Sequence, residues 1–363
     1  MKKVAIFLLL GLIITACSKH SDDTGENNIA DPDTELYFPS ITSSEWATIS
    51  PEELGWNTAA EQPLYDLLEE NDTKAFLILK NGKIAVEEYF GTFTKDSIWY
   101  WASAGKTLTA FTVGIAQEQG LLELEDKSSL YLGEGWSSAP LEKENEITIW
   151  NQLTMTSGLN DLFFDCVTPG CLLYTADAGT RWAYHNGPYT LLDGVVSAAA
   201  GTTFSNFYTA ELRDKIGMDG FWFSTNGLNN VYFSTPRSMA RFGLLNLNDG
   251  NWNGTEILGD MEYINSMRNT SQELNESYGY LWWLNGKDSY RIPGTQQEFS
   301  GQLIPNAPAS LYAGLGKNDQ KLYIVPDQRL VIVRMGNDSG EELAGPSSFD
   351  NELWGKIQDL LNN

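Results

Sequence analysis

Histidine is scarce in this chain of 363 residues, which contains only His20 and His185. A Ser-His-Asp triad could use only the second of these, and the G-x-S-x-G nucleophile elbow occurs nowhere. The H-E-x-x-H signature of zincins is absent as well. Residues 105–107 (Gly-Lys-Thr) match the end of a P-loop, but Tyr100 stands where its first glycine is required. Lysine and tyrosine therefore remain as the available bases for a nucleophilic serine.

Positive charge is also scarce. The chain has 23 lysines and arginines against 48 aspartates and glutamates, which gives a formal net charge of -25 at pH 7. This balance argues against nucleic acids and anionic membrane surfaces as partners, and we interpret it as an acidic, soluble surface. With 42% hydrophobic residues, 12 Trp and 16 Tyr, the composition is typical of a globular chain. One large two-lobed domain and two separate domains both fit this length.

Long apolar runs are missing after the first twenty residues. Two lysines precede an apolar stretch over residues 4–14, which is too short to span a bilayer as a mature helix. Residues 14–17 (Ile-Thr-Ala-Cys) resemble a bacterial lipobox, in which small residues precede a cysteine that is lipidated after cleavage. The resemblance implies a signal peptide over residues 1–16, a lipid on Cys17, and a place in the bacterial cell envelope, at the outer membrane or the periplasmic face. An ordinary secretory signal is the alternative.

Residues 17–43 are polar, acidic and poor in aromatic side chains, so we expect a flexible tether that ends where the folded part, residues 44–363, begins. With Cys17 lipidated, only Cys166 and Cys171 remain, in a loop that contains Pro and Gly. An extracytoplasmic compartment permits a disulfide, and we expect these two cysteines to pair. Two free thiols, or two ligands of an adventitious metal, are the alternative.

The apolar pattern predicts strands at both ends of the folded part. Residues 76–79 and 84–86 flank Asn81-Gly82, a strong signal for a two-residue hairpin. A helix follows, with apolar residues at helical spacing up to Gly120. The other expected elements are helices that start after Thr148 and Thr235, strands over 322–325 and 330–333 separated by Pro326-Asp327, and a closing helix over 349–361.

This order of elements predicts an α+β fold. Strands at both ends of the chain imply an antiparallel sheet that is flanked by helices and completed by segments distant in sequence. The helices between them imply an inserted, mostly helical lobe over roughly residues 115–250. We expect a functional site at the seam between the two.

Ser103 and Lys106 are the most informative pair of residues in the chain. Positions three apart share one face of a helix, so the lysine amine can reach the serine hydroxyl. A serine hydroxyl is a weak nucleophile until a neighbouring group takes its proton, and a desolvated lysine can do so. Because one S-x-x-K is expected by chance in such a chain, the motif gains weight from those that follow it. These are residues 154–159 (Thr-Met-Thr-Ser-Gly-Leu), 184–186 (Tyr-His-Asn) and a glycine-bearing strand near Gly314.

In this order the motifs resemble the β-lactamase-like serine hydrolases, which include class C β-lactamases, D-alanyl-D-alanine carboxypeptidases, related carboxylesterases and 6-aminohexanoate-oligomer hydrolases. The resemblance covers most of residues 46–361 and implies a β-lactamase/transpeptidase-like fold. It implies that Ser103 is the acylated nucleophile and Lys106 its base partner. Tyr184 would relay protons, with a pKa lowered by the Lys106 ammonium, which leaves open which of the two is the acylation base. Asn186 would orient the lysine or hold the substrate amide.

The third motif departs from the family. Lys-Thr-Gly or His-x-Gly is common on the strand that faces the nucleophile, whereas this chain has the run Tyr-Ala-Gly-Leu-Gly-Lys. If Gly314 takes the place of the motif glycine, Tyr312 replaces the cation. The N–H groups of Leu315 and Ser103 would then form the oxyanion hole. The missing cation disfavours a β-lactam or a D-alanine carboxylate as ligand, although Lys317 could compensate in a shifted register.

Several residues near these motifs have two interpretations. His185 either makes a pH-sensitive contact in the site or, as we favour, lies packed behind the loop. The aromatic run over residues 278–283 forms a packed strand more readily than an acyl pocket. Trp99 and Trp101 either wall the pocket and desolvate Lys106 or belong to the core. The cysteine loop either rims the entrance or is a plain surface loop.

We therefore expect a serine hydrolase that forms an acyl-enzyme on Ser103, acts on a small ester or amide, and needs neither metal nor organic cofactor. We expect a monomer that binds a small-molecule or peptide-like acyl substrate and reaches the membrane through its lipid. A penicillin-recognising D-alanyl-D-alanine carboxypeptidase or a β-lactamase is one alternative, and it requires a cation near Leu315. A non-catalytic binding lipoprotein of the cell envelope is the other, although a binding module has no need of the serine, lysine and tyrosine together.

Overall fold

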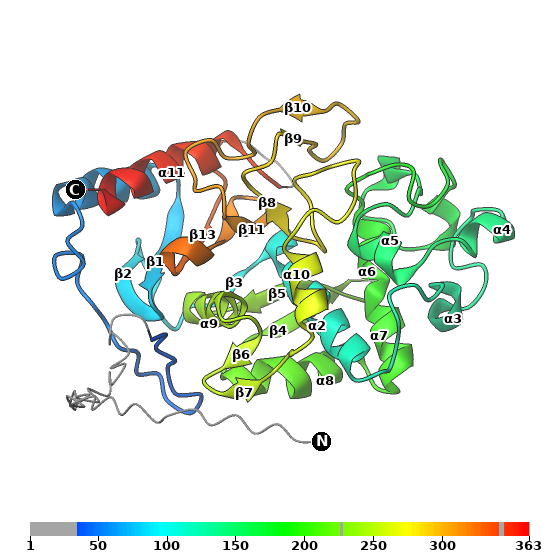
Figure 1. Ribbon diagram of the computed structural model, residues 1–363, viewed down its shortest axis with the longest axis horizontal. Helices are drawn as coiled ribbons and strands as arrows, with labels where there is room; N and C mark the ends of the chain where they lie inside the picture. The colour runs from blue at the N-terminus through cyan, green and yellow to red at the C-terminus, as the bar shows by residue number, and fades with distance from the viewer. Residues whose placement is uncertain (1–34, 226–227, 341–344, 363) are drawn as a thin grey trace, which may run out of the picture. The chain divides into compact units, whose positions relative to one another are not determined.

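The structure is a computed structural model that describes residues 35–225, 228–340 and 345–362 (Figure 1). The predicted signal peptide, Cys17 and most of the predicted tether lie outside these residues. In the part of the chain that is described, no helix has both the length and the apolar character needed to cross a membrane.

The folded part begins earlier than the predicted residue 44. The chain from Leu36 onward forms one compact unit. The Tyr37 N–H donates a hydrogen bond to the Asn81 carbonyl oxygen over 2.9 Å, and the Phe38 ring lies edge-on to Trp252 with centroids 5.1 Å apart. These contacts anchor the residues that were expected to end the tether, because even a few aromatic side chains in a polar segment gain free energy by burial.

A six-stranded antiparallel sheet is the core of this unit, and both ends of the chain contribute to it, as predicted. Its central strands are buried along almost their whole length, which explains why they appear in the sequence as continuous apolar runs. The strand order is β2 (Lys83–Tyr89), β1 (Thr73–Lys80), β13 (Leu330–Gly336), β12 (Gln320–Val325), β11 (Tyr312–Gly316) and β8 (Trp283–Leu284).

The hairpin between β1 and β2 is confirmed. Asn81 and Gly82 both have positive φ, 49° and 79°, which is the backbone of a type I′ turn. A Cβ at Gly82 would lie 1.9 Å from the Tyr37 carbonyl oxygen, so the position requires glycine for space as well as for conformation.

Helices cover both faces of the sheet (Figure 1). α1 (Glu61–Glu70) and α11 (Ser348–Leu361) lie on one face, where Trp354 of α11 packs on Tyr323 of β12 with ring centroids 5.6 Å apart. α9 (Pro236–Leu247) and the start of α2 (Lys106–Glu118) lie on the other face. The predicted closing helix is α11, and its residues Leu353, Ile357 and Leu360 are buried as their spacing predicts.

The inserted lobe gathers on one side of the sheet in Figure 1, drawn in cyan to green. Its predicted helix starts are confirmed: Thr148 caps a helix through a capping box with Asn151, and Thr235 caps α9 with a proline at the first helical turn. The lobe is mostly helical, as predicted, and it also carries two strands, β4 and β5, of a separate sheet ordered β3 (Trp99–Tyr100), β5 (Leu228–Ser234) and β4 (Phe221–Thr225). Its helices are α3 (Ser129–Leu132), α4 (Leu141–Glu144), α5 (Ile149–Leu153), α6 (Asn186–Thr190), α7 (Leu192–Ala200) and α8 (Phe204–Tyr208).

Shorter elements connect these layers. They are β6 (Asn251–Trp252) with β7 (Thr255–Glu256), α10 (Met261–Met267), β9 (Ser289–Tyr290) with β10 (Phe299–Ser300), and one-turn helices that include η2 (Ala102–Gly105), η3 (Asp161–Phe163), η4 (Pro169–Cys171) and η7 (Pro326–Gln328).

Candidate active site

Ser103 and Lys106 meet where β3 passes into α2. The serine lies in the 3-10 turn η2, and the lysine is the first residue of α2. Lys106 Nζ donates a hydrogen bond to Ser103 Oγ over 3.0 Å. The lysine is 3% exposed, whereas the serine remains partly exposed. The two side chains therefore lie together as their spacing predicts, with the hydroxyl on the accessible side.

The backbone just before Ser103 is strained. Ala102 has a φ of +46°, in the left-handed region that costs a residue with a Cβ about 1 kcal/mol or more. Two hydrogen bonds hold the segment: the Trp101 N–H donates to the Tyr232 carbonyl oxygen (2.8 Å), and the Ala104 N–H donates to the Trp101 carbonyl oxygen (3.0 Å). The surrounding structure thus fixes the position of the serine at a local cost in free energy.

Lys106 is buried among aromatic rings. Its Nζ lies 4.2 Å from the centroid of the Tyr189 ring and 5.1 Å from that of Tyr184. Burial lowers the pKa of the amine to about 7, and the negative charge of Asp165 partly opposes this shift. A large fraction of the amine is therefore unprotonated at neutral pH, as a lysine that takes a proton from a hydroxyl must be.

Tyr184 lies against the same amine, but its predicted pKa is wrong in direction. Its side chain is 1% exposed and shares a hydrogen bond with Ser103. Burial raises the pKa of the phenol above its ordinary value, and the bond to Ser103 only partly offsets this. The prediction assumed a permanent ammonium at Lys106, whereas desolvation weakens that charge. The phenol of Tyr184 therefore keeps its proton at neutral pH.

Asn186 lies at the start of α6 and is bound to the segment just before the cysteine loop. Its Nδ2 donates to Asp165 Oδ1 over 2.6 Å, and its backbone N–H donates to the Phe164 carbonyl oxygen over 3.0 Å. Its Oδ1 is buried with no hydrogen-bond partner among the described residues. The amide therefore faces Asp165 with its donor and leaves an acceptor unpaired.

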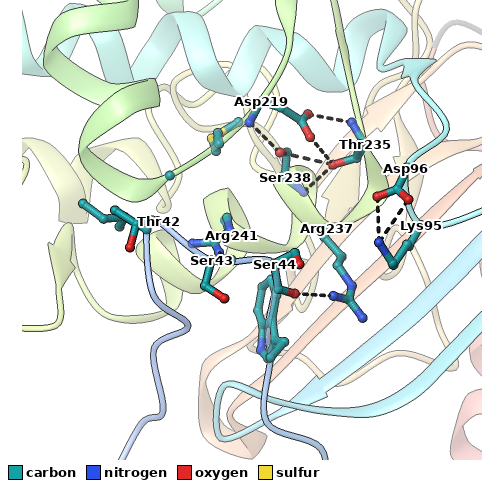
Figure 2. Close-up of a pocket in the computed structure, with 14 residues that line it drawn as sticks. Thr42, Ser43, Ser44, Lys95, Asp96, Asp219, Thr235, Arg237, Ser238 and Arg241 are labelled. Atoms are coloured by element: carbon teal, nitrogen blue, oxygen red, sulfur yellow. Dashed lines mark hydrogen bonds and ion pairs between the residues drawn. The ribbon is translucent and has the colours of Figure 1, made fainter.

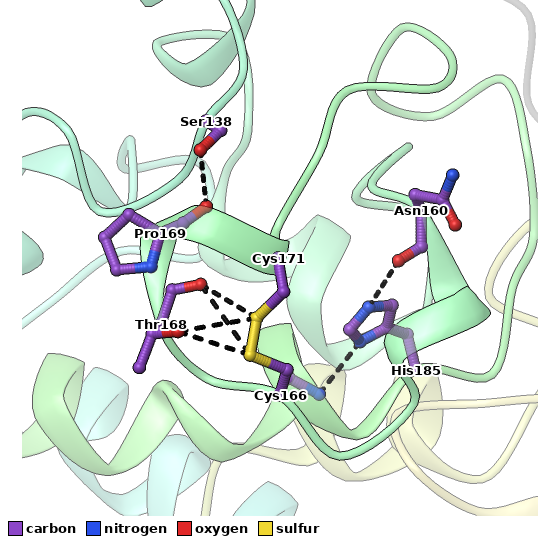
Figure 3. The surroundings of a disulfide bond; sticks show 8 residues. Ser138, Asn160, Cys166, Thr168, Pro169, Cys171 and His185 are labelled. Atoms are coloured by element: carbon purple, nitrogen blue, oxygen red, sulfur yellow. Dashed lines mark hydrogen bonds between the residues drawn. A yellow bond between two sulfur atoms is a disulfide. The ribbon is translucent and has the colours of Figure 1, made fainter.

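His185 is structural, as we favoured. The residue is 1% exposed; its Nδ1 accepts from the Gly187 N–H over 2.9 Å, and its Nε2 lies 2.8 Å from the Asn160 carbonyl oxygen (Figure 3). Since Nδ1 accepts, Nε2 must carry the proton and donate. Burial also lowers the pKa of the imidazole, which favours this neutral form. The side chain caps α6 from behind the segment that carries Tyr184.

The Thr-Met-Thr-Ser-Gly-Leu motif supports that segment. The Met155 carbonyl oxygen accepts a hydrogen bond from the Ala183 N–H over 2.9 Å. The hydroxyls of Thr154 and Thr156 are hydrogen-bonded to each other over 2.8 Å. A Cβ at Gly158 would lie 2.1 Å from the Ala176 carbonyl oxygen. The motif therefore serves as a buried scaffold beside Tyr184, and small or hydroxylated residues recur in it because the backbones approach closely.

The third motif forms β11, whose edge passes close to Ser103. The Asn285 N–H donates to the Leu311 carbonyl oxygen over 2.9 Å, so the backbone groups of alternate residues, including Leu315, point toward β8. β8 pairs only with Tyr312 and Ala313, which leaves this edge open at Leu315. The next residue, Gly316, packs against the nucleophile: a Cβ there would lie 3.1 Å from the Ser103 nitrogen.

Gly314 also faces the serine turn, since a Cβ there would lie 3.3 Å from the Ala104 carbonyl oxygen. Tyr312, by contrast, does not replace a cation in the site. It is 3% exposed, and its hydroxyl donates to the Asn246 carbonyl oxygen in α9 over 3.0 Å. Lys317 lies in the exposed turn after β11. In the register with Gly314 as the motif glycine, the cation position thus holds a tyrosine, whose hydroxyl also interacts with Arg268, a residue paired with Asp249.

The aromatic residues divide into core and site. Residues 278–283 are packed core, as favoured, and Tyr278 and Trp283 hold the Tyr184 ring with centroids 6.2 and 5.8 Å away. Trp101 also belongs to the core, with its Nε1 donating to Ser234 Oγ over 2.7 Å. Trp99 Nε1 donates to the Gly336 carbonyl oxygen over 3.1 Å. The rings that contact the Lys106 amine are tyrosines, so neither tryptophan desolvates it by direct contact.

Cys166 and Cys171 form a disulfide, as predicted (Figure 3). Phe164, two residues before the disulfide, and Cys166 itself both contact the site. The Phe164 ring is stacked on Tyr184 with centroids 5.9 Å apart, and a Cβ at Gly187 would lie 2.3 Å from the Cys166 carbonyl oxygen. The loop therefore rims the site, and the disulfide restricts its backbone beside α6.

Sequence reasoning missed four residues at this site: Tyr189, Asp165, Phe164 and Gly316. Each of them contacts a predicted site residue, or acts on it electrostatically, from a different segment of the chain. No spacing rule could therefore identify the first three. Gly316 had a local signal, because it repeats Gly314 two positions later and so faces the same side of a strand.

A separate cavity of about 320 Å³ lies between residues 41–46 and the start of α9 (Figure 2). Its polar groups bind one another or nearby backbone: Arg237 donates to the Ser44 carbonyl oxygen (2.8 Å), and Asp219 Oδ2 accepts from the Thr235 hydroxyl (2.7 Å). None of Ser103, Lys106 and Tyr184 lines it. No group of three His, Cys, Asp or Glu is arranged to hold a metal ion in the ranges that the structure covers.

Comparison with known proteins agrees with this geometry. Residues 68–352 match the β-lactamase family. An uncharacterised protein of Alkalihalophilus pseudofirmus is 26% identical over 300 residues, which are 72% of this chain and 83% of that protein.

Two solved structures have the same fold at low identity. A candidate 6-aminohexanoate-dimer hydrolase from Bacillus anthracis has a TM-score of 0.67 at 19% identity and covers 90% of each chain. An octameric penicillin-binding protein homologue from Pyrococcus abyssi has a TM-score of 0.62 at 16% identity, over 84% of this chain and 77% of that one. These likenesses confirm the predicted α+β fold with its helical lobe. Since the family match spans most of the chain, the protein belongs to the β-lactamase family of serine hydrolases.

Proposed function

We propose that the protein is a serine hydrolase that forms an acyl-enzyme on Ser103 and acts on a small ester or amide. One observation carries the proposal: a buried amine with a pKa near 7, that of Lys106, lies 3.0 Å from a partly exposed serine hydroxyl. A serine in this arrangement can lose its proton without a histidine.

Acylation begins when the neutral Lys106 amine takes the Ser103 proton as Oγ bonds to the acyl carbon. The carbonyl oxygen gains the negative charge, and the N–H groups of Ser103 and Leu315 would stabilise it. The tetrahedral intermediate collapses with loss of the alcohol or amine, which receives the proton from the Lys106 ammonium through the Tyr184 hydroxyl. Water then adds to the acyl-enzyme by the same proton path in reverse, which releases the acid and restores the serine.

An ester or amide is favoured over a β-lactam because Tyr312, which is not basic, stands at the motif position of the carboxylate-binding cation. Its hydroxyl is turned away from the site into α9. A penicillin-recognising carboxypeptidase needs such a cation, so turnover of D-alanyl-D-alanine peptides or β-lactams faster than neutral esters would replace our proposal with that alternative.

Labelling with a fluorophosphonate probe tests the proposal. The intact mass of the purified protein should increase by one probe equivalent, and Ser103→Ala should gain none. Lys106→Met serves as a matched control, since it keeps the serine and removes its base, and it should be labelled slowly. Absence of labelling on the native protein would refute the hydrolase proposal and favour the non-catalytic binding lipoprotein.

We also propose that the protein is anchored in the bacterial cell envelope through a lipid on Cys17, on the strength of the lipobox-like residues 14–17. Cys17→Ser should move the protein from the membrane fraction to the soluble fraction of expressing cells. Retention of the variant in the membrane fraction would contradict lipid anchoring at this cysteine.

A further inference from the structure

Asp165 is a charged residue at the site that no motif predicts. It lies one residue before Cys166, just outside the loop that the disulfide closes, and its side chain is exposed. Its carboxylate accepts a hydrogen bond from Asn186 over 2.6 Å, and its negative charge favours the protonated form of the Lys106 amine. Both partners belong to the catalytic region, so a substrate that enters beside Ser103 enters within the field of this carboxylate.

The bond to Asp165 decides the orientation of the Asn186 amide. The opposite rotamer would place Oδ1 against the carboxylate, with two acceptors in contact, so Nδ2 must face Asp165. Oδ1 is then left buried and unpaired among the described residues. Leaving a buried acceptor unpaired costs free energy, and a donor in the substrate would remove that cost.

On the opposite side of the site, the described residues that face the serine turn are not basic, and Arg268, which lies at the Tyr312 hydroxyl, is paired with Asp249. The residues of β11 that face the serine turn are Gly314 and Gly316, and Tyr312 is engaged with α9. Next to Phe164, which stacks on Tyr184, the Asn186 side of the site thus carries an amide oxygen and a carboxylate. Both accept hydrogen bonds, and both repel an anion.

We propose that Asp165 is a specificity-determining residue: its carboxylate, with the Asn186 amide that it orients, favours acyl substrates that carry an N–H or ammonium donor and disfavours those that carry a carboxylate. This inference rests on the proposed hydrolase function. Specificity here comes from a repulsive element as much as from an attractive one. Since the carboxylate is exposed, its effect on a charged substrate is moderate and is screened by salt.

Three 4-nitrophenyl benzoates of matched shape test the inference. They carry a 4-methyl, a 4-aminomethyl or a 4-carboxy group and are therefore neutral, cationic or anionic at pH 7.5. The native protein should show the highest kcat/KM for the cationic ester and the lowest for the anionic one. Asp165→Asn should reduce the ratio of cationic to anionic kcat/KM about threefold to tenfold, and Asp165→Lys should invert the preference. Glu142→Gln, which removes one exposed charge from α4, should leave the ratio unchanged.

Salt provides a check that needs no variant. In 1 M NaCl the ratio measured with the native protein should fall toward that of Asp165→Asn, because the Debye length shortens to about 3 Å. Hydrolysis of all three esters through Ser103 with a ratio that neither the variants nor salt alter would overturn the role of Asp165 and leave the hydrolase proposal standing. Failure of the native protein to hydrolyse any ester, together with absence of fluorophosphonate labelling, would overturn both.

Discussion

Two buried lysines in this protein have opposite surroundings. Lys321 in β12 is fully buried, with its Nζ 2.9 Å from Asp319 and 2.8 Å from Asp350. Lys106 in α2 is buried almost as completely, yet its Nζ contacts a hydroxyl and two aromatic rings. Both amines are buried away from water, but only the Lys321 amine is in direct contact with carboxylates.

The difference shows what each amine can do. Burial alone would raise the pKa of Asp319, but the Lys321 ammonium and the hydroxyls of Ser347 and Ser339 outweigh it and lower this pKa to about 2. Lys321 therefore joins β12 to α11 as part of a fixed charge network. Without a direct carboxylate partner, the pKa of Lys106 falls to about 7, and the amine is available to exchange protons. Direct pairing makes a buried lysine structural, and its absence makes one reactive.

Replacing Lys106 by Met should have the largest effect on activity. The variant keeps the volume of the side chain and removes the base, so kcat/KM for a neutral aryl ester should fall about 10³-fold. Because the native amine is buried without an ion pair, the melting temperature should stay unchanged or rise. Steady-state kinetics and thermal melting measure the two effects. Activity within tenfold of the native protein would exclude Lys106 as the base.

Replacing Lys321 by Met should lower the stability of the protein, the reverse of what we expect for Lys106→Met. The carboxylates of Asp319 and Asp350 would remain buried without their cation, which should lower the free energy of unfolding by about 3–5 kcal/mol. The change is measured by urea unfolding followed by tryptophan fluorescence. Lys356→Met, a half-buried lysine of α11, is the control and should change stability by less than about 0.5 kcal/mol. A loss below about 1 kcal/mol in the Lys321 variant would show that the network is not a structural requirement.

The pH dependence of activity and stability should show the smallest of these effects, and it should report on Lys106. Lys106 must be neutral to act, so kcat/KM should rise about tenfold per pH unit below pH 7 and level off above it. Stability should also rise with pH between about 7 and 10.5, because in that window the unfolded chain binds a proton at this lysine that the folded protein does not. Lys106→Met should remove that part of the stability profile. A kinetic midpoint above pH 9 would contradict a desolvated lysine base.

Local features of the sequence predicted local structure well. The Asn81-Gly82 hairpin and the caps at Thr148 and Thr235 depend on residues a few positions apart, and all are confirmed. The spacing of Ser103 and Lys106 is local in the same sense, so their contact could be predicted as well. The boundary of the folded part could not, because the contacts of Tyr37 are with residues far along the chain.

The site shows the same division. The direction of the Tyr184 pKa was predicted wrongly, because it depends on how deeply other segments bury the phenol. The position of Tyr312 depends on α9, where the Asn246 carbonyl oxygen accepts a hydrogen bond from its hydroxyl. Asp165 could not be found from any motif, since the segment before the cysteine loop carries it to Asn186 across twenty residues of sequence.

The sequence by itself determined the family, the order of the elements and the contact between Ser103 and Lys106, because each rests on neighbours in the chain. The tertiary structure alone decided the properties of those side chains. Aromatic rings from a distant helix remove water from Lys106, and a carboxylate from the segment before the cysteine loop sets the charge beside it. Desolvation and electrostatic fields depend on distance in space, so they were fixed only once the lobe had folded against the sheet.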